Sequence, residues 1–215
     1  MTIHSVPAAA LSVRRKSDTA PKREAILRAA IDVFAERGFF NAQVADVARA
    51  AGVAAGTVYL YFRGKDDLLV SIFEKTMREG LAEGRAAVDG VADPAERLRI
   101  FARLHLGRLG RDRHLAIVFQ VELRQSVKFM ERFSSTLFRD YLGQIRAAIT
   151  DGQQAHVFRA DLSATVAAKV FFGALDEMAT NWILSRRRYP LEADADPVVD
   201  LFLRGVRADD REAPE

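Results

Sequence analysis

A short stretch of small and hydroxyl-bearing residues has the chemistry needed to contact a nucleic acid. Thr57 carries a hydroxyl group and a methyl group, and the methyl group can pack on the methyl group of a thymine base. Tyr59 and Tyr61 carry hydroxyl groups that can reach phosphates, and Lys65 adds a positive charge nearby. Small residues at the start of the same segment would let the backbone approach DNA closely. The candidate DNA-binding residues are Lys22, Gln43, Ala55, Gly56, Thr57, Tyr59, Tyr61 and Lys65.

Two short helices must position these residues, and the sequence from Val44 to Phe62 has the pattern of such a pair. The first helix is predicted over residues 44–51 and the second over residues 55–61. Gly52 lies between them and can adopt the positive φ that a tight turn requires. This is the pattern of a helix-turn-helix unit, whose second helix enters the major groove. A helical hairpin packed inside a protein core would produce the same pattern.

Basic residues are concentrated toward the N-terminus. Residues 1–65 contain ten Lys and Arg and five Asp and Glu, a net charge of +5, whereas the whole chain has +3, so the remainder carries −2. A basic end on a nearly neutral body is typical of a protein that binds a polyanion. A solvated tail that only raises solubility would give the same distribution.

Helical periodicity extends along almost the whole chain and predicts an all-α fold of about nine helices. Pro21 and Gly38 mark the expected start and end of the first long helix. The pair Asp93-Pro94 marks the expected start of a later helix. The last two long helices are expected at about 161–187 and 196–206. We predict a disordered basic arm at 1–20, a three-helix helix-turn-helix domain at 21–66, a larger ligand-binding and dimerisation domain at 67–208, and a flexible tail at 209–215.

A second group of residues, in the larger domain, has the chemistry to bind a lipophilic molecule with charged groups. Aromatic and aliphatic side chains at helical spacing could line a tunnel, and a series of arginines (Arg99, Arg103, Arg108, Arg111 and Arg113) could neutralise phosphates. Glu122 falls on an apolar face, where a buried carboxylate needs a partner, and we expect an arginine from another helix. The candidate ligand-binding residues are Phe101, Arg103, Leu104, Arg108, Phe119, Glu122, Phe133, Phe172, Leu175, Asp176, Met178 and Trp182. Ordinary core packing and a solvated arginine face would also explain these patterns.

The sequence contains no motif of a catalytic or metal site, and we therefore expect neither an enzyme nor a bound cofactor or metal. It has no nucleophile elbow, zinc-protease motif, phosphate-binding loop or dinucleotide fingerprint. The absence of cysteine excludes disulfides and thiolate sites. His105 is expected to be half-buried with its hydrogen bonds satisfied. Because the chain has no long apolar run and its N-terminus lacks the order of a signal peptide, we predict a cytoplasmic protein without a membrane span.

Residues 22–73 resemble the DNA-binding domain of the TetR/AcrR family of repressors. The matching stretches are Ala29–Phe39, Val47-Ala48, Ala51–Val53, Gly56–Phe62 and Lys65–Leu69. Two positions depart from the family pattern. The family usually has Thr or Ser where this chain reads Asn41-Ala42-Gln43, so Asn41 or Gln43 must cap the next helix. Tyr61 replaces a frequent His, which leaves the DNA sequence of the half-site open.

The larger domain resembles the FadR-type branch of that family in residues 114–118, 122–126 and 172–177 and at Trp182. The resemblance implies a homodimer, joined through the last two long helices, that binds palindromic double-stranded operator DNA. It implies long-chain acyl-CoA as the effector that releases the DNA, by tilting the helix at 65–80, and genes of fatty-acid degradation as the targets. Two alternatives stay open: a repressor that senses another lipophilic molecule or drug and controls an efflux pump, and a helical adaptor that does not bind DNA.

Overall fold

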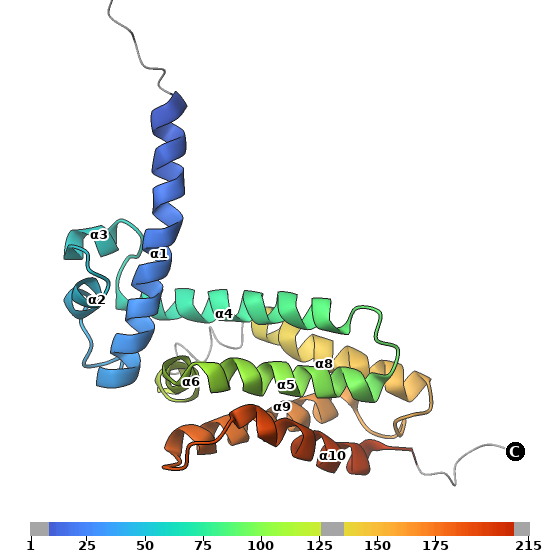
Figure 1. Ribbon diagram of the computed structural model, residues 1–215. Coiled ribbons are helices and arrows are strands. Elements are labelled where there is room, and N and C mark those ends of the chain that lie inside the picture. Colours follow the sequence, from blue (N-terminus) through green and yellow to red (C-terminus); the bar gives the residue numbers. More distant parts are fainter. Residues whose placement is uncertain (1–8, 126–135, 209–215) are drawn as a thin grey trace, which may run out of the picture. The chain divides into compact units, whose positions relative to one another are not determined.

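The computed structural model describes residues 9–125 and 136–208, with side chains from residue 20 onward (Figure 1). In this part of the chain there are nine α-helices and two short 3-10 helices, and the extended structure is limited to one isolated bridge between Phe158 and Arg207. The predicted all-α fold is therefore confirmed. The chain divides into two compact units, Met1–Ile72 and Phe73–Glu215, each with its own core.

The first unit is built from α1 (Ala9–Arg37), α2 (Val44–Ala50), α3 (Ala55–Tyr59) and the beginning of α4 (Lys65–Val88). Each of these helices turns one apolar face inward, as the periodicity predicts. The fully buried side chains of its core include Ile26, Leu27, Phe34, Val47, Val58, Phe62, Leu68 and Leu69. Because every helix contributes to this core, the short α2 and α3 are held by tertiary packing and not by their own helix propensity.

Helix α1 begins earlier than the sequence predicted. We expected Pro21 to start the helix, but α1 starts at Ala9 and Pro21 lies inside it. The fixed φ of proline suits a helix, but a proline inside one removes a hydrogen bond and its ring crowds the carbonyl group four residues earlier, so Pro21 weakens α1 at this point. At the other end, Gly38 has a φ of 77° and terminates α1 as predicted. Residues 1–8 of the predicted arm and the predicted tail at 209–215 lie outside the described residues.

The second unit contains the rest of α4 and the helices that follow it in the chain. They are α5 (Pro94–Arg111), α6 (Arg113–Gln120), η1 (Glu122–Arg124), α8 (Thr136–Gln154), α9 (Ala164–Leu184), η2 (Leu191–Asp194) and α10 (Ala195–Val206). Side chains cap several of them: Asp93 accepts the Ala95 N–H at 2.9 Å and so opens α5 at the predicted place. Such caps stop one helix and start the next without leaving backbone N–H groups unpaired.

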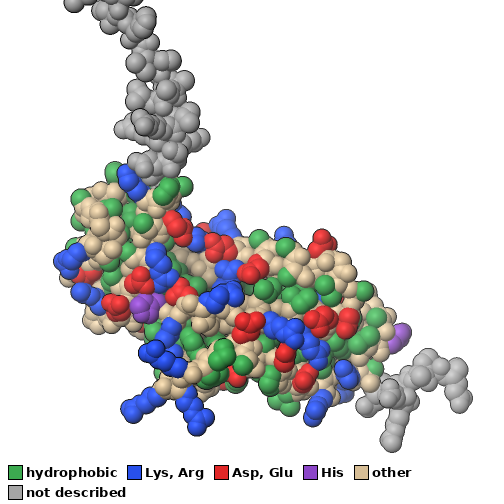
Figure 2. Space-filling view, viewed as in Figure 1, with side chains coloured by type: hydrophobic (Ala, Val, Ile, Leu, Met, Phe, Trp, Pro, Cys, Tyr) green, Lys and Arg blue, Asp and Glu red, His purple; other side chains and the backbone are tan. Residues whose placement is uncertain are grey.

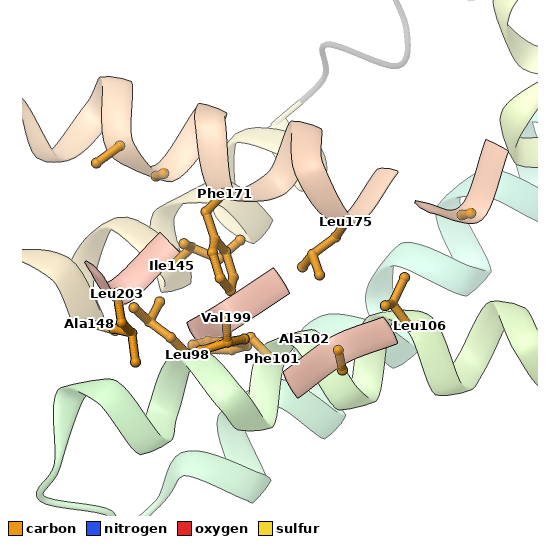
Figure 3. Packing of buried hydrophobic residues seen from close by; sticks show 14 of the residues in the cluster. Leu98, Phe101, Ala102, Leu106, Ile145, Ala148, Phe171, Leu175, Val199 and Leu203 are labelled. Carbon is orange, nitrogen blue, oxygen red and sulfur yellow. The ribbon is translucent and has the colours of Figure 1, made fainter. Parts of the chain in front are cut away.

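The core of the second unit forms around α5 (Figure 3). Leu98, Phe101, Ala102 and Leu106 of α5 point toward Ile145 and Ala148 of α8, Phe171 and Leu175 of α9, and Val199 and Leu203 of α10. Burying each large apolar side chain contributes about 1.5–3 kcal/mol relative to leaving it exposed. This packing fixes α5 in the middle of the unit, so its remaining face can form the wall of a pocket.

Candidate DNA-binding helix and internal pocket

The turn between α2 and α3 has the geometry of a helix-turn-helix. Gly52 adopts a φ of 66°, as predicted, and the Val53 N–H donates to the Ala48 carbonyl oxygen at 2.9 Å. Val58 is completely buried and anchors α3 to the core of the first unit. The side of α3 opposite Val58 is therefore free to face a ligand.

Helix α3 exposes the residues that the sequence proposed for DNA contact. Tyr59 is 58% exposed, and Ala55 and Gly56 are also exposed, whereas Thr57 and Tyr61 are half-buried. Leu60, which the sequence reasoning did not include, is 81% exposed beside Tyr59. An exposed Tyr59 with a hydroxyl at its tip is suited to donate to a phosphate oxygen.

Gln43 begins α2 as its N-cap residue. Its backbone N–H donates to the Asp46 carboxylate at 3.1 Å, and Asp46 also accepts hydrogen bonds from Arg37 and Arg49. Of the two caps that the sequence allowed, the structure uses Gln43, because the Asn41 side chain donates to the Arg37 carbonyl oxygen instead. The Gln43 side chain and Lys22 on α1 are both exposed.

Lys65 has a different environment from the one expected of a phosphate contact. Its ammonium group donates to the carbonyl oxygens of Phe39 at 3.0 Å, Phe40 at 2.9 Å and Ala42 at 3.3 Å, and it lies 4.8 Å from the centre of the Phe39 ring. An ammonium group has three N–H donors, and all three are used. Lys65 therefore holds the loop between α1 and α2 in place.

An enclosed pocket lies in the second unit, between α4, α5, α6, α8 and α9. Its lining is predominantly apolar, and its free volume is about 60 Å³. The lining residues are Thr76, Met77, Gly80, Glu83, Gly84, Phe101, Leu104, His105, Arg108, Leu109, Phe119, Gln120, Arg124, Phe138, Tyr141, Phe172 and Asp176. Gly80 and Gly84 bring the backbone of α4 directly to the pocket wall, since they have no side chain.

The charged residues of the pocket wall are paired with one another. Arg108 on α5 donates to Glu79 at 3.3 Å and to Glu83, both on α4. Arg124 donates to both carboxylate oxygens of Asp176 at 2.6 and 2.8 Å. These ion pairs tie α5 to α4 and η1 to α9, and they leave little net charge facing the interior of the pocket.

His105 is a polar residue that lies among aromatic rings. Its Nδ1 lies 3.0 Å from the Tyr141 hydroxyl, and its ring lies edge-on to Phe172. Burial lowers the pKa of His105 to about 4, so the ring is neutral at pH 7. His105 is half-buried, as predicted, but the expectation that its hydrogen bonds are satisfied is wrong, because the buried Nε2 has no partner among the described residues. Sequence spacing could not reveal the surroundings of the His105 ring, since Tyr141 lies on another helix.

Comparison with known proteins places this helix-turn-helix and pocket in a family. Residues 26–72 match the model of bacterial regulatory proteins of the tetR family, and residues 73–205 match that of the C-terminal region of YsiA-like proteins. The chain belongs to the TetR family of bacterial regulatory proteins.

Several relatives of this TetR-family protein are regulators of fatty-acid metabolism. It is 34% identical to the fatty acid metabolism regulator protein of Bacillus subtilis, over 86% of this chain and 96% of that protein. It resembles the structure of the fatty acid degradation regulator FadR from Bacillus halodurans, with a TM-score of 0.83 and 37% identity over 88% of this chain and 98% of that one. It also resembles Bacillus subtilis FadR in complex with stearoyl-CoA, with a TM-score of 0.81 and 32% identity over 86% and 99% of the two chains. The predicted FadR-type branch is confirmed.

Half of the predicted ligand-binding residues of this TetR-family protein line the pocket. Phe101, Leu104, Arg108, Phe119, Phe172 and Asp176 do so. Leu175 is instead part of the core around α5. Glu122 is buried, as predicted, next to the pocket wall formed by η1, and Gln125 donates to it at 3.2 Å. The arginine partner that we expected for Glu122 stays a prediction.

The other predicted ligand residues lie elsewhere. Arg103 donates to Asp196 at 2.9 and 3.0 Å, and this hydrogen bond lowers the pKa of Asp196. Trp182 packs in the core, with its indole N–H donating to the Tyr189 carbonyl oxygen at 2.9 Å. Met178 lines an apolar groove between α9 and α10. Phe133 lies outside the described residues.

Most of the arginines that we expected to meet phosphates already have partners. Arg99 pairs with Asp200 at 2.6 Å, Arg103 pairs with Asp196, Arg108 pairs with two glutamates, and Arg113 donates to the carbonyl oxygens of Trp182 and Ile183. Figure 2 shows acidic and basic side chains intermixed over the visible face of the second unit, which agrees with this pairing. Sequence periodicity placed these arginines on α5 but could not reveal the acids that α4 and α10 bring to them.

A second set of cations, which the sequence reasoning missed, lines a surface groove along α8. The charged residues there are Arg85, Arg139, Asp140, Arg146 and Lys169, a net charge of +3 from four cations and one acid. Within the described residues, Arg85, Arg146 and Lys169 form no ion pair. Gln144 separates the groove from the pocket: it lines the groove, and its Oε1 lies 2.7 Å from the position of a Cβ on Gly84 in the pocket wall.

Helices α9 and α10 expose an apolar face. Val166 is 59% exposed, Val170 58% and Leu201 76%, and all three line the groove that contains Met178. Exposed apolar patches of this kind mark interaction surfaces in soluble proteins. Within residues 9–125 and 136–208, no helix combines the length and the hydrophobicity required to cross a lipid bilayer.

Proposed function

We propose that this TetR-family protein represses genes of fatty-acid degradation, binds palindromic operator DNA as a homodimer and leaves it when long-chain acyl-CoA binds. The observation that carries the proposal is the predominantly apolar pocket of the second unit, in a chain similar over 86% of its length to a FadR bound to stearoyl-CoA. We propose that the protein acts in the cytoplasm as a regulator, with neither catalysis nor a cofactor.

Helix α3 reads the operator. Tyr59 donates to a phosphate, and the exposed N-terminal residues Ala55 and Gly56 let the helix approach the bases. Lys65 contributes indirectly, because its three hydrogen bonds hold the loop that precedes α2. In a dimer, two such helices about 34–36 Å apart would meet successive major grooves.

The dimer forms through α9 and α10. Their exposed apolar residues Val166, Val170 and Leu201 would be covered by the same face of a second copy, as a two-fold interface requires. Leu201→Arg places a charge in this face, and we expect the variant to be a monomer that no longer shifts operator DNA.

The effector places its apolar chain in the pocket and its phosphates in the groove on α8. The free cations Arg85, Arg146 and Lys169 supply the positive charge that a nucleotide diphosphate requires. Since Gln144 and Gly84 form the boundary, a ligand that crosses it would occupy both sites.

Ligand binding reaches the DNA through α4. This helix contributes Met77, Gly80 and Gly84 to the pocket, and its N-terminal turn belongs to the DNA-binding unit. A chain that enters the pocket must push α4 away from α5, against the bonds from Arg108 to Glu79 and Glu83. Only a ligand that binds the displaced state more tightly shifts the equilibrium.

The test is a gel-shift titration with an operator selected in vitro from random DNA. We expect palmitoyl-CoA at micromolar concentration to release the DNA, and free palmitate to release little. Arg85→Ala combined with Arg146→Ala should raise the palmitoyl-CoA concentration needed for release, whereas the matched control Arg99→Ala, whose arginine already pairs with Asp200, should not. Binding of DNA without release by any acyl-CoA would remove the effector assignment, and release by a drug-like lipophile would favour control of an efflux pump. Absence of any DNA shift would favour a helical adaptor.

A further inference from the structure

The His105 imidazole lines the pocket, and one of its nitrogens has no partner among the described residues. The ring is surrounded by the aromatic side chains of Tyr141 and Phe172, with centroid distances of 5.9 and 5.5 Å. Its Nδ1 is engaged by the Tyr141 hydroxyl, while Nε2 is buried and has no partner. Leaving a buried polar atom without a partner is unfavourable, so a ligand that supplies the missing partner gains affinity.

The hydrogen bond with Tyr141 determines which nitrogen carries the proton. The contact to Nδ1 at 3.0 Å is the hydrogen bond that the structure gives the Tyr141 hydroxyl. The Tyr141 hydroxyl keeps its proton, because burial raises its pKa. If Nδ1 donated to the hydroxyl instead, the hydroxyl hydrogen would have no acceptor among the described residues, so donation from Tyr141 to Nδ1 leaves fewer polar groups unpaired. Nδ1 is therefore the acceptor, and the neutral ring carries its own proton on Nε2. The unpaired group of this pocket-lining residue is therefore a hydrogen-bond donor.

The charge balance of the pocket wall determines what kind of acceptor fits this donor. The cations Arg108 and Arg124 are both bound to carboxylates, those of Glu83 and Asp176 among them. A buried carboxylate on the ligand would have no free cation in the wall, and its desolvation would be unfavourable. A neutral carbonyl oxygen, in contrast, needs only the N–H of His105.

We propose that His105 Nε2–H donates a hydrogen bond to the thioester carbonyl oxygen of the bound acyl-CoA, and that Tyr141 is the positioning residue that orients the imidazole. This assignment rests on the proposed function and adds the residue by which the pocket distinguishes an acyl thioester from other amphiphiles with the same chain.

The experiment compares two ligands that differ only at the thioester carbonyl: palmitoyl-CoA and S-hexadecyl-CoA, a thioether in which a CH₂ group replaces the carbonyl group. Dissociation constants for the full-length protein are measured by isothermal titration calorimetry. We expect wild type to prefer the thioester about five- to tenfold, the contribution of one hydrogen bond. His105→Leu should abolish the preference, and His105→Gln, whose amide N–H lies near the position of Nε2, should restore part of it.

Two further variants separate recognition of the carbonyl group from a structural effect. Tyr141→Phe should reduce the preference, because the ring loses its orienting bond. Phe119→Leu, a change elsewhere in the same wall, should weaken both ligands equally.

Equal binding of the two ligands by wild type, or a His105→Leu variant that keeps the preference, would overturn the assignment and leave the proposed function standing. If wild type binds neither ligand, the proposed function falls together with the assignment.

Discussion

Replacing Lys65 by methionine tests whether this residue contacts DNA or supports the fold. Methionine keeps the apolar stem of lysine but removes the ammonium group that donates to the carbonyl oxygens of Phe39, Phe40 and Ala42. A hydrogen bond from a charged donor contributes about 1.5–3 kcal/mol, and three partly exposed bonds that share one ammonium group contribute about 2 kcal/mol in total. A loss of that size lowers Tm by about 4–8 °C in a chain of this length.

The assay pairs thermal unfolding with the salt dependence of operator binding. We expect Lys65→Met to melt at a lower temperature and to bind DNA more weakly, while the slope of log affinity against log salt stays unchanged. Arg63→Met, which removes an exposed cation nearby, serves as the control and should keep the wild-type Tm. If Lys65→Met melts like wild type and its salt slope falls by about one, Lys65 contacts a phosphate and does not support the fold.

Three further substitutions test the packing, the turn and the buried histidine. Gly152→Ala should destabilise the second unit by about 1–3 kcal/mol in urea unfolding, since the new Cβ would lie 2.2 Å from the buried Phe158 ring, whereas Gly143→Ala on the same helix has nothing within 4 Å and should not destabilise it. Gly52→Ala should cost about 1–2 kcal/mol, because the turn holds a φ of 66°, and circular dichroism melting would measure it. The pKa of His105 is lowered from 6.5 to about 4, so the folded state binds fewer protons than the unfolded state between these values. The contribution of His105 to the free energy of unfolding should therefore be fully present above pH 6.5. It should fall by up to about 1.4 kcal/mol per pH unit down to pH 4. His105→Gln should remove this part of the pH dependence.

Local signals in the sequence predicted the elements well. The cap at Asp93, the terminator Gly38 and the turn at Gly52 all act through bonds or torsions within a few residues, so their effects can be deduced from neighbours in the chain. The start of α1 at Ala9 is the exception, because a proline favours a helix start and yet the helix continues through Pro21.

The site was predicted less completely because its decisive contacts join distant parts of the chain. Arg103 is an attractive phosphate ligand on α5 alone, but α10 brings Asp196 to it. Lys65 was assigned to DNA because no local pattern shows that three carbonyl oxygens of a preceding loop converge on it. Periodicity assigns a residue to a face of a helix, and only the packing of helices shows what that face meets.

The small volume of the pocket implies that ligand binding depends on the length of the acyl chain. Its free volume of about 60 Å³ is far below the roughly 300–1,000 Å³ of sites that hold small molecules, so the helices must separate before an acyl chain fits. The free energy of that separation is a fixed cost for every ligand, whereas each buried CH₂ group adds about 0.8 kcal/mol of stabilisation. In the proposed function, chains below a threshold length would leave the helices together, and the opening that admits a long chain would also move α4.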